Sequence, residues 1–210
     1  MKKPAGISRS SPSCGGWFIE AGYSEIVLPS IWESGTFLGK IGPDKEAQMW
    51  TFRDRGNRPV CLVPEATGMV QELWNNGWAA TMPKPARIFY VARCYRYERP
   101  QTGRYREFTQ FGIEALGPSV SREEVVSLMK ACLDELGIPY TFHDKVRRGL
   151  RYYIDAGFET ECAALGAVRQ LGGGGRYAEG IGWAFGVERL LLAQALRDGR
   201  ERLAEVEETD

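Results

Sequence analysis

The chain has 210 residues, 43% of them hydrophobic, and its 27 lysine and arginine residues balance 27 aspartate and glutamate residues. This length predicts one globular domain, and the zero formal charge argues against a protein that mainly coats nucleic acid or an acidic membrane. The five cysteines form no CxxC pair and His143 is the single histidine, so neither a zinc site nor a disulfide framework is expected. The sequence contains no secretory leader and no run of about 18 apolar residues, which predicts a soluble protein of a reducing, cytoplasmic compartment.

The predicted elements indicate one mixed domain. Residues 1–15 predict a flexible lead-in, residues 16–198 the domain itself, and residues 199–210 a polar tail. Strands are expected at 25–29, 48–53, 59–63, 87–97, 106–115, 140–143 and 150–159, and near 162–171. Helices are expected at 69–79, 121–136 and 187–196; Ser121 and Glu124 have capping-box spacing at the start of the second, and Gly137 ends it. Because short turns join most strands, we predict an α+β fold with a mostly antiparallel sheet flanked by helices.

The segment 86–115 carries the strongest chemical signal. Two strand candidates flank the loop sequence ERPQTGRY, and alternation places one polar and aromatic set on a single face of the second strand: Arg106, Phe108, Gln110 and Glu114. The other face is apolar and predicts a core: Phe111, Ile113 and Ala115. All six cations between residues 87 and 106 are arginine, the side chain suited to a bidentate grip on phosphate or carboxylate. A solvated arginine-rich hairpin is the alternative.

Three further segments are informative. Alternation over residues 150–159 predicts a strand whose polar face includes Tyr153, although such strands are often merely half-exposed. In VPEATG, Glu65 and Thr67 could cap the helix that follows or hold an ammonium group. Four glycines at 172–175 indicate backbone that passes close to a ligand or another strand, whereas a dinucleotide fingerprint fits poorly. We interpret His143 as structural.

Arg189 lies in the first turn of its expected helix. The helix dipole disfavours a cation there by about 0.3–1 kcal/mol, and a bound polyphosphate would reverse that effect. A surface arginine paired with a nearby carboxylate is the alternative.

Taken together, these segments resemble the catalytic core of histidyl-tRNA synthetase, a class II aminoacyl-tRNA synthetase family. AGYSEIVLPSIWES resembles motif 1, whose proline, here Pro29, lies at the family's dimer interface. YRYERPQTGRYREFTQFGIE resembles motif 2, RGLRYY resembles the histidine-binding RGLDYY motif, GGGRYAEG resembles GGGRYDGL, and GWAFGVERL resembles motif 3. Only about 30 residues separate Glu114 from Arg148 and a short tail follows motif 3, so we expect neither the family's insertion domain nor its anticodon-binding domain.

The resemblance implies a class II sheet, a homodimer, a requirement for ATP and Mg²⁺, and amino-acid adenylate formation. It implies catalytic roles for Arg96, which would hold the α-phosphate and the amino-acid carboxylate, and for Arg148, which would stabilise charge during attack. ATP would be held by Arg96, Glu98, Arg104, Arg106, Phe108 and Arg189. The amino acid would be held by Glu65, Thr67 and Gln110 at its ammonium group and, around its imidazole ring, by Glu114, Tyr152 and Tyr153. The sequence departs from the family at Arg151 and Ala178, where the family has aspartate.

Two functions from different classes fit this pattern. The first is a minimal, ATP-dependent histidyl-tRNA synthetase-like enzyme that activates an amino acid, histidine, for transfer to tRNA, a carrier or a small molecule. The second is a non-catalytic, amino-acid-sensing subunit similar to the regulatory subunit of ATP phosphoribosyltransferase. An isolated interaction module with a relict pocket is a third. The retained arginines favour the enzyme.

Overall fold

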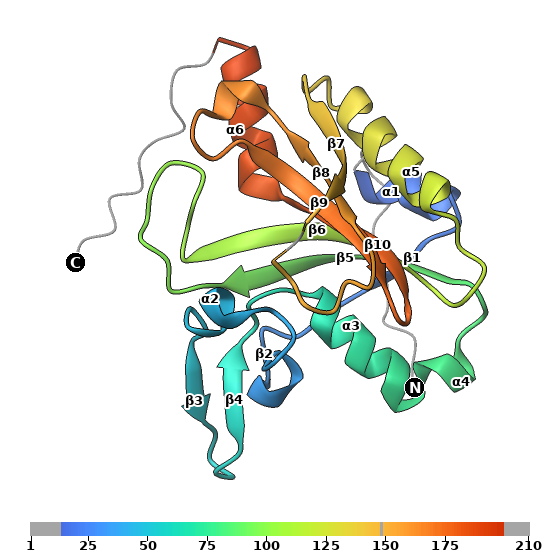
Figure 1. Ribbon diagram of the computed structural model, residues 1–210, viewed down its shortest axis with the longest axis vertical. Coiled ribbons are helices and arrows are strands. Elements are labelled where there is room, and N and C mark those ends of the chain that lie inside the picture. The colour runs from blue at the N-terminus through green and yellow to red at the C-terminus, as the bar shows by residue number, and fades with distance from the viewer. Residues whose placement is uncertain (1–13, 148, 200–210) are drawn as a thin grey trace.

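The computed structural model describes residues 14–147 and 149–199. Its main sheet has seven strands in the order β1-β5-β6-β10-β9-β8-β7 (Figure 1). These strands are β1 (Ser24–Ile26), β5 (Ala86–Tyr95), β6 (Glu107–Leu116), β7 (Thr141–Val146), β8 (Gly157–Glu161), β9 (Gln170–Tyr177) and β10 (Gly180–Gly186). The β1–β5 pair is parallel and the other pairs are antiparallel, which confirms the predicted sheet.

A second sheet and several helices cover the main sheet. The second sheet has the order β2-β4-β3 and consists of β2 (Ile31–Glu33), β3 (Thr51–Arg53) and β4 (Pro59–Leu62). The helices are α1 (Cys14–Glu20), α2 (Pro43–Glu46), α3 (Thr67–Leu73), α4 (Ala79–Thr81), α5 (Arg122–Glu135) and α6 (Val187–Arg197). A π-turn, Trp74–Trp78, joins α3 to α4, and short 3₁₀ turns lie at Ser34–Thr36 and Ala163–Leu165. The fold is therefore α+β, as predicted.

Two core layers lie on opposite faces of the main sheet. One layer packs α1, α5 and α6 against strand residues such as Phe111 and Ile113. The other packs α3 and the small sheet against Tyr90 and Cys94 of β5 (Figure 1). The apolar face predicted for the second hairpin strand is confirmed, because Phe111, Ile113 and Ala115 all belong to the first layer. Alternation along β5 and β6 consequently turns their other face toward the small sheet and the site described below.

Helix α5 forms for the reasons visible in its sequence. The Ser121 hydroxyl accepts a hydrogen bond from the Glu124 N–H at 3.0 Å, and Gly137 follows the helix at a φ of 62°. The stripe that includes Val125, Met129 and Cys132 is buried in the first layer. This cap and this stripe together confirm the predicted helix.

The strand expected at 150–159 is wrong for most of its length. Residues 150–156 form a loop with one isolated bridge, Tyr153 to Tyr177, and β8 begins only at Gly157. Ile154, which the pattern placed on a buried face, is 64% exposed. Alternating apolar residues arose here because Leu150, Tyr152 and Tyr153 all pack against the second core layer from a loop.

The glycine run is a strand rather than a ligand-binding loop. It forms most of β9, and a Cβ atom at Gly172 or Gly174 would overlap backbone oxygens of β10. The predicted close approach is thus to another strand. The sequence did not predict β10, β2, α1 or α2, and the strand expected near 162–171 is a 3₁₀ turn for part of its length. The expected lead-in lies outside the described residues except where α1 begins, and the tail lies outside them from residue 200 onward.

Within the described ranges, every helix is too short or too polar to cross a lipid bilayer.

Candidate active site

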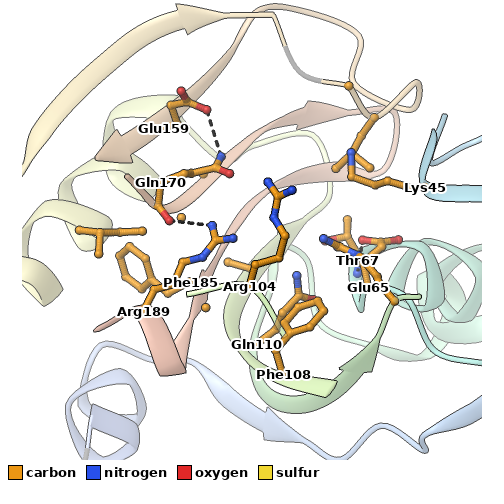
Figure 2. Close-up of a pocket in the computed structure, with 18 of the residues that line it drawn as sticks. Lys45, Glu65, Thr67, Arg104, Phe108, Gln110, Glu159, Gln170, Phe185 and Arg189 are labelled. Atoms are coloured by element: carbon orange, nitrogen blue, oxygen red, sulfur yellow. Dashed lines mark hydrogen bonds between the residues drawn. The ribbon is translucent and has the colours of Figure 1, made fainter. Parts of the chain in front are cut away.

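A cavity of about 340 Å³ lies on the face of β5, β6, β9 and β10 that carries the predicted polar side chains (Figure 2). Most of the predicted site residues line it although they come from distant segments: Glu65, Thr67, Arg96, Glu98, Arg104, Phe108, Gln110, Tyr152, Tyr153 and Arg189. Two others, Arg106 and Glu114, do not line it, and Arg148 lies outside the described residues. The chain therefore folds ten of the thirteen predicted residues around one space.

Arg189, at the start of α6, anchors one end of the cavity. Its Nε donates to the Gly103 carbonyl oxygen at 2.8 Å and its Nη1 donates to the Gln170 carbonyl oxygen at 2.8 Å. Burial and the nearby guanidinium groups of Arg104 and Arg96 lower the pKa of Arg189 from its ordinary value. Both of these hydrogen bonds go to neutral backbone oxygens, so the positive potential of this end remains available to an anion.

Arg96 and Arg104 extend the same positive end, which Figure 2 shows around Arg104 and Arg189. The Arg96 guanidinium lies over the Phe108 ring, 4.9 Å from its centroid, and its Nε donates to the Pro64 carbonyl oxygen at 3.0 Å. Arg104 pairs with Glu98 at 3.0 Å. We call Arg96, Arg104 and Arg189 the guanidinium end.

Arg106 lies outside the cavity, on the far side of the same loop. Its guanidinium stacks on the Tyr97 ring at 4.8 Å, and its Nε donates to the Glu98 carbonyl oxygen at 3.2 Å. In this arrangement Arg106 supports the β5–β6 loop that carries Glu98 and Arg104.

Two buried carboxylates define the opposite end, which we call the carboxylate end: Glu65 and Glu114. Glu65 is 3% exposed and accepts hydrogen bonds from the Thr67 N–H at 3.0 Å, the Gly68 N–H at 2.8 Å and the Tyr152 hydroxyl at 3.1 Å. Burial raises the pKa of Glu65, and these three donors oppose that rise.

Glu114 is completely buried behind the cavity wall. Its Oε1 accepts from the Thr67 hydroxyl at 2.7 Å and the Tyr90 hydroxyl at 3.2 Å, and its Oε2 accepts from the Tyr177 hydroxyl at 2.7 Å. Burial raises the pKa of Glu114 to about 7; the negative charge of Glu65 adds to the rise, while the hydroxyl donors reduce it. Thr67 joins the two carboxylates, because its N–H donates to Glu65 and its hydroxyl donates to Glu114.

The structure adds residues that the sequence analysis missed. Tyr90 and Tyr177 hold Glu114, and Tyr90 could have been found because it shares a strand face with Arg96. Lys45 lines the cavity from α2, a four-residue helix with no periodicity to reveal it. Gln170 also lines it and donates from Nε2 to the Glu159 carboxylate at 3.0 Å. His143 lies away from the cavity and pairs with Glu161 at 3.2 Å, in line with a structural role.

Comparison with known proteins identifies relatives of this chain. The histidyl-tRNA synthetase family model matches residues 12–144. Histidine–tRNA ligase of Methanosarcina acetivorans is 43% identical over 119 residues, which are 56% of this chain and 29% of that protein. The aligned part is less than a third of the length of the first curated relatives that the chain matches.

Solved structures share the fold at low sequence identity. A histidine–tRNA ligase subunit from Alicyclobacillus acidocaldarius superposes with a TM-score of 0.72 at 15% identity, over 94% of this chain and 98% of that one. An ATP phosphoribosyltransferase regulatory subunit/histidyl-tRNA synthetase from Bacillus halodurans superposes with a TM-score of 0.70 at 16% identity, over 92% and 83% of the two chains. The fold is that of a class II synthetase core, and by its match to the family model over residues 12–144 the chain belongs to the histidyl-tRNA synthetase family.

Proposed function

We propose that this chain activates an amino acid, histidine, by forming its adenylate from ATP. The observation that carries the proposal is the charge distribution of one cavity, with three arginines at one end and two buried carboxylates at the other. A triphosphate and an ammonium group are the two charged parts that the substrates of such a reaction bring to the site. The cavity would hold them at opposite ends and the reacting carboxylate and α-phosphate between them.

The reaction needs positioning and fixed positive charge more than a proton acceptor. An oxygen of the amino-acid carboxylate attacks the α-phosphorus, the bond from phosphorus to the bridging oxygen breaks, and pyrophosphate leaves with that electron pair. The attacking carboxylate is already ionised near neutral pH, so no base is required. Arg96 would neutralise charge on the α-phosphate and Arg189 on the γ-phosphate. Glu98 and Arg104 would hold ATP with Phe108 against its base.

The resemblance assigns further roles that we keep as part of the proposal. Arg148 would stabilise the α-phosphate during attack, Arg106 would support the ATP-binding loop, and Tyr153 would contact the amino-acid side chain from the cavity wall. Mg²⁺ would enter with the ATP phosphates. Among the described residues no cluster of three or more metal-ligating side chains exists, which fits an ion held by phosphates and one or two carboxylates. The Glu159 and Glu188 carboxylates, both of which line the cavity, could supply them.

Amino-acid-dependent exchange of labelled pyrophosphate into ATP tests the proposal. We expect exchange with histidine, dependent on Mg²⁺, and no exchange with the other nineteen amino acids. Exchange with a different amino acid would retain activation and correct the substrate. Binding of histidine in a calorimeter without any exchange would instead favour the second candidate.

That second candidate is a non-catalytic, amino-acid-sensing subunit. The likeness to the Bacillus halodurans protein favours it, since that protein's description includes a regulatory subunit. The three arginines of the guanidinium end favour the enzyme, because a protein that senses only an amino acid has no use for a triphosphate site. If the enzyme is active, charging of total tRNA separates tRNA from a carrier or small molecule as the acceptor.

We also propose that the chain forms a homodimer through the segment around Pro29. Val27 is 85% exposed, and the parallel register of Ile26 with Tyr90 places it next to Val91, which is 54% exposed. Two adjacent exposed valines at a sheet edge are better explained by a partner than by solvent. Light scattering after gel filtration should give twice the chain mass for the wild type and the single mass for Val27→Asp. A monomeric wild-type protein would refute the dimer.

A further inference from the structure

Thr67 faces the cavity with a hydroxyl whose proton is already committed. The hydroxyl donates to Glu114 Oε1 at 2.7 Å, and a threonine hydroxyl has a single proton to donate. What Thr67 presents to a ligand is therefore a pair of oxygen lone pairs. A ligand group that donates hydrogen bonds can bind there, whereas an acceptor such as a carboxylate cannot.

Tyr152 is fixed in the same way by the other buried carboxylate. Its hydroxyl donates to Glu65 Oε2 at 3.1 Å while the residue lines the cavity. Two hydroxyl oxygens are thus polarised toward acceptance by two carboxylates that lie behind them. A primary ammonium group, which has three N–H donors and no acceptor, matches this arrangement.

Gln110 shows the opposite polarity beside them. Its Oε1 accepts from the Ala66 N–H at 3.1 Å and lies 3.2 Å from the Cys94 thiol. The amide N–H groups are consequently the part of Gln110 left for a ligand, and they suit an acceptor such as the substrate carboxylate. The ammonium role that the resemblance gave to Gln110 is therefore disfavoured by its hydrogen bonds.

Glu114 cannot reach a ligand directly in this structure. Both of its oxygens are occupied by hydroxyl groups, from Thr67 and Tyr90 on one and Tyr177 on the other, and it does not line the cavity. In the part of the chain that the structure describes, the hydrogen-bond partners of this carboxylate are neutral hydroxyls. Its negative charge reaches the cavity only through the Thr67 hydroxyl.

We propose that Glu114 is a positioning residue that fixes the Thr67 hydroxyl as an acceptor for the substrate ammonium group, rather than a contact for the substrate side chain. Tyr90 and Tyr177 hold the carboxylate in the orientation that this requires. The inference rests on the proposed function, since it specifies how the amino acid is held in that same site.

The test compares histidine with its deaminated analogue, 3-(imidazol-4-yl)propionate, by calorimetry on the full chain. Glu114→Gln keeps the shape of the side chain and removes the charge behind Thr67. We expect the affinity for histidine to fall about five- to tenfold, because a hydrogen bond backed by a charge is stronger than one between neutral groups. The affinity for the analogue, which lacks the ammonium group, should change less than about twofold.

Two more variants separate positioning from a general structural effect. Thr67→Val should reduce the preference for histidine over the analogue, Thr67→Ser should restore it, and Glu114→Gln should cause no further loss in the Thr67→Val background. Tyr90→Phe, the mildest change, should cause a smaller loss in the same direction. Glu107→Gln, an exposed change on the same strand, is the matched control and should alter neither affinity.

The outcomes are distinct. An equal loss of affinity for both ligands in Glu114→Gln would place the carboxylate at the imidazole ring and overturn the inference. Unchanged affinities would overturn it as well. Because calorimetry reads binding alone, histidine binding without pyrophosphate exchange would reject the enzyme and still decide the role of Glu114. If the wild type binds no amino acid, the inference fails together with the proposed function.

Discussion

The guanidinium end and the carboxylate end of the cavity hold opposite charges in different surroundings. At the guanidinium end, Arg104 is 48% exposed on a loop, and Arg189 starts a helix where backbone carbonyls hold it. At the carboxylate end, Glu65 is 3% exposed, Glu114 is fully buried, and both accept hydrogen bonds from groups on packed elements.

This difference shows how one site can serve two unlike ligand parts. Partly solvated arginines on a loop can adjust around a bulky, highly charged triphosphate at low cost in stability. A small ammonium group is better held by acceptors fixed in advance, but burying carboxylates without a cation costs several kcal/mol. We therefore expect substitutions at the guanidinium end to change catalysis alone and substitutions at the carboxylate end to change stability too.

Removal of Arg96 should have the largest effect. Arg96→Ala deletes a fixed cation near the expected α-phosphate, and loss of one such group lowers rates by about 100- to 1000-fold. We expect kcat/KM for pyrophosphate exchange to fall by that factor while the melting temperature changes by less than about 3 °C, as for a partly exposed side chain. Arg93→Ala, on the opposite face of the same strand and paired with Glu107, is the control and should retain activity. Equal losses in both variants would remove the distinction between the two faces.

At the carboxylate end, a single added methyl group should unfold the chain more easily. Gly182 lies opposite Glu114 in the β6–β10 register, and a Cβ atom there would overlap the Glu114 carboxylate and the Ile113 carbonyl oxygen. Because the obstacles are a buried carboxylate and backbone, we expect Gly182→Ala to reduce the free energy of unfolding by about 3 kcal/mol in urea titrations. Gly35→Ala, with no atom within 4 Å of the new Cβ, should leave it nearly unchanged. Wild-type stability of Gly182→Ala would mean that the carboxylate end is not rigid.

Local patterns were sufficient to predict the guanidinium end. Alternation along the hairpin put Phe108 and Gln110 on one face, and the concentration of arginine identified the ligand charge, because both signals lie within about 30 consecutive residues. Arg189 was predicted from its position in a helix start. The hairpin strands and α5 were found for the same reason, since their signals do not depend on distant partners.

The carboxylate end depends on contacts between distant segments, which sequence patterns do not contain. Tyr90 and Tyr177 meet Glu114 only through the pairing of β5, β6, β10 and β9. The two rings of Tyr152 and Tyr153 both line the cavity, which alternation in a strand would forbid, because a loop packed on the core positions them. The glycine run was ambiguous because tight packing against a strand and close approach to a ligand demand the same residue.

Finally, the carboxylate end should make stability depend on pH, whereas arginines stay charged throughout the range concerned. The pKa of Glu114 is about 7 in the folded chain and about 4.3 in an unfolded one. Between these values the folded chain binds a proton that the unfolded chain releases, so this contribution to stability is complete below pH 4 and is lost as the pH rises through 7. From pH 5 to pH 7 we expect a loss of about 2 kcal/mol in the wild type relative to Glu114→Gln, measured by urea unfolding of both proteins. Other titrating groups, including Glu65, are common to the two proteins, so the change in their difference reports Glu114. A difference that stays constant with pH would show that Glu114 keeps an ordinary pKa, and the contrast between a solvated and a buried end would then rest on geometry without an electrostatic consequence.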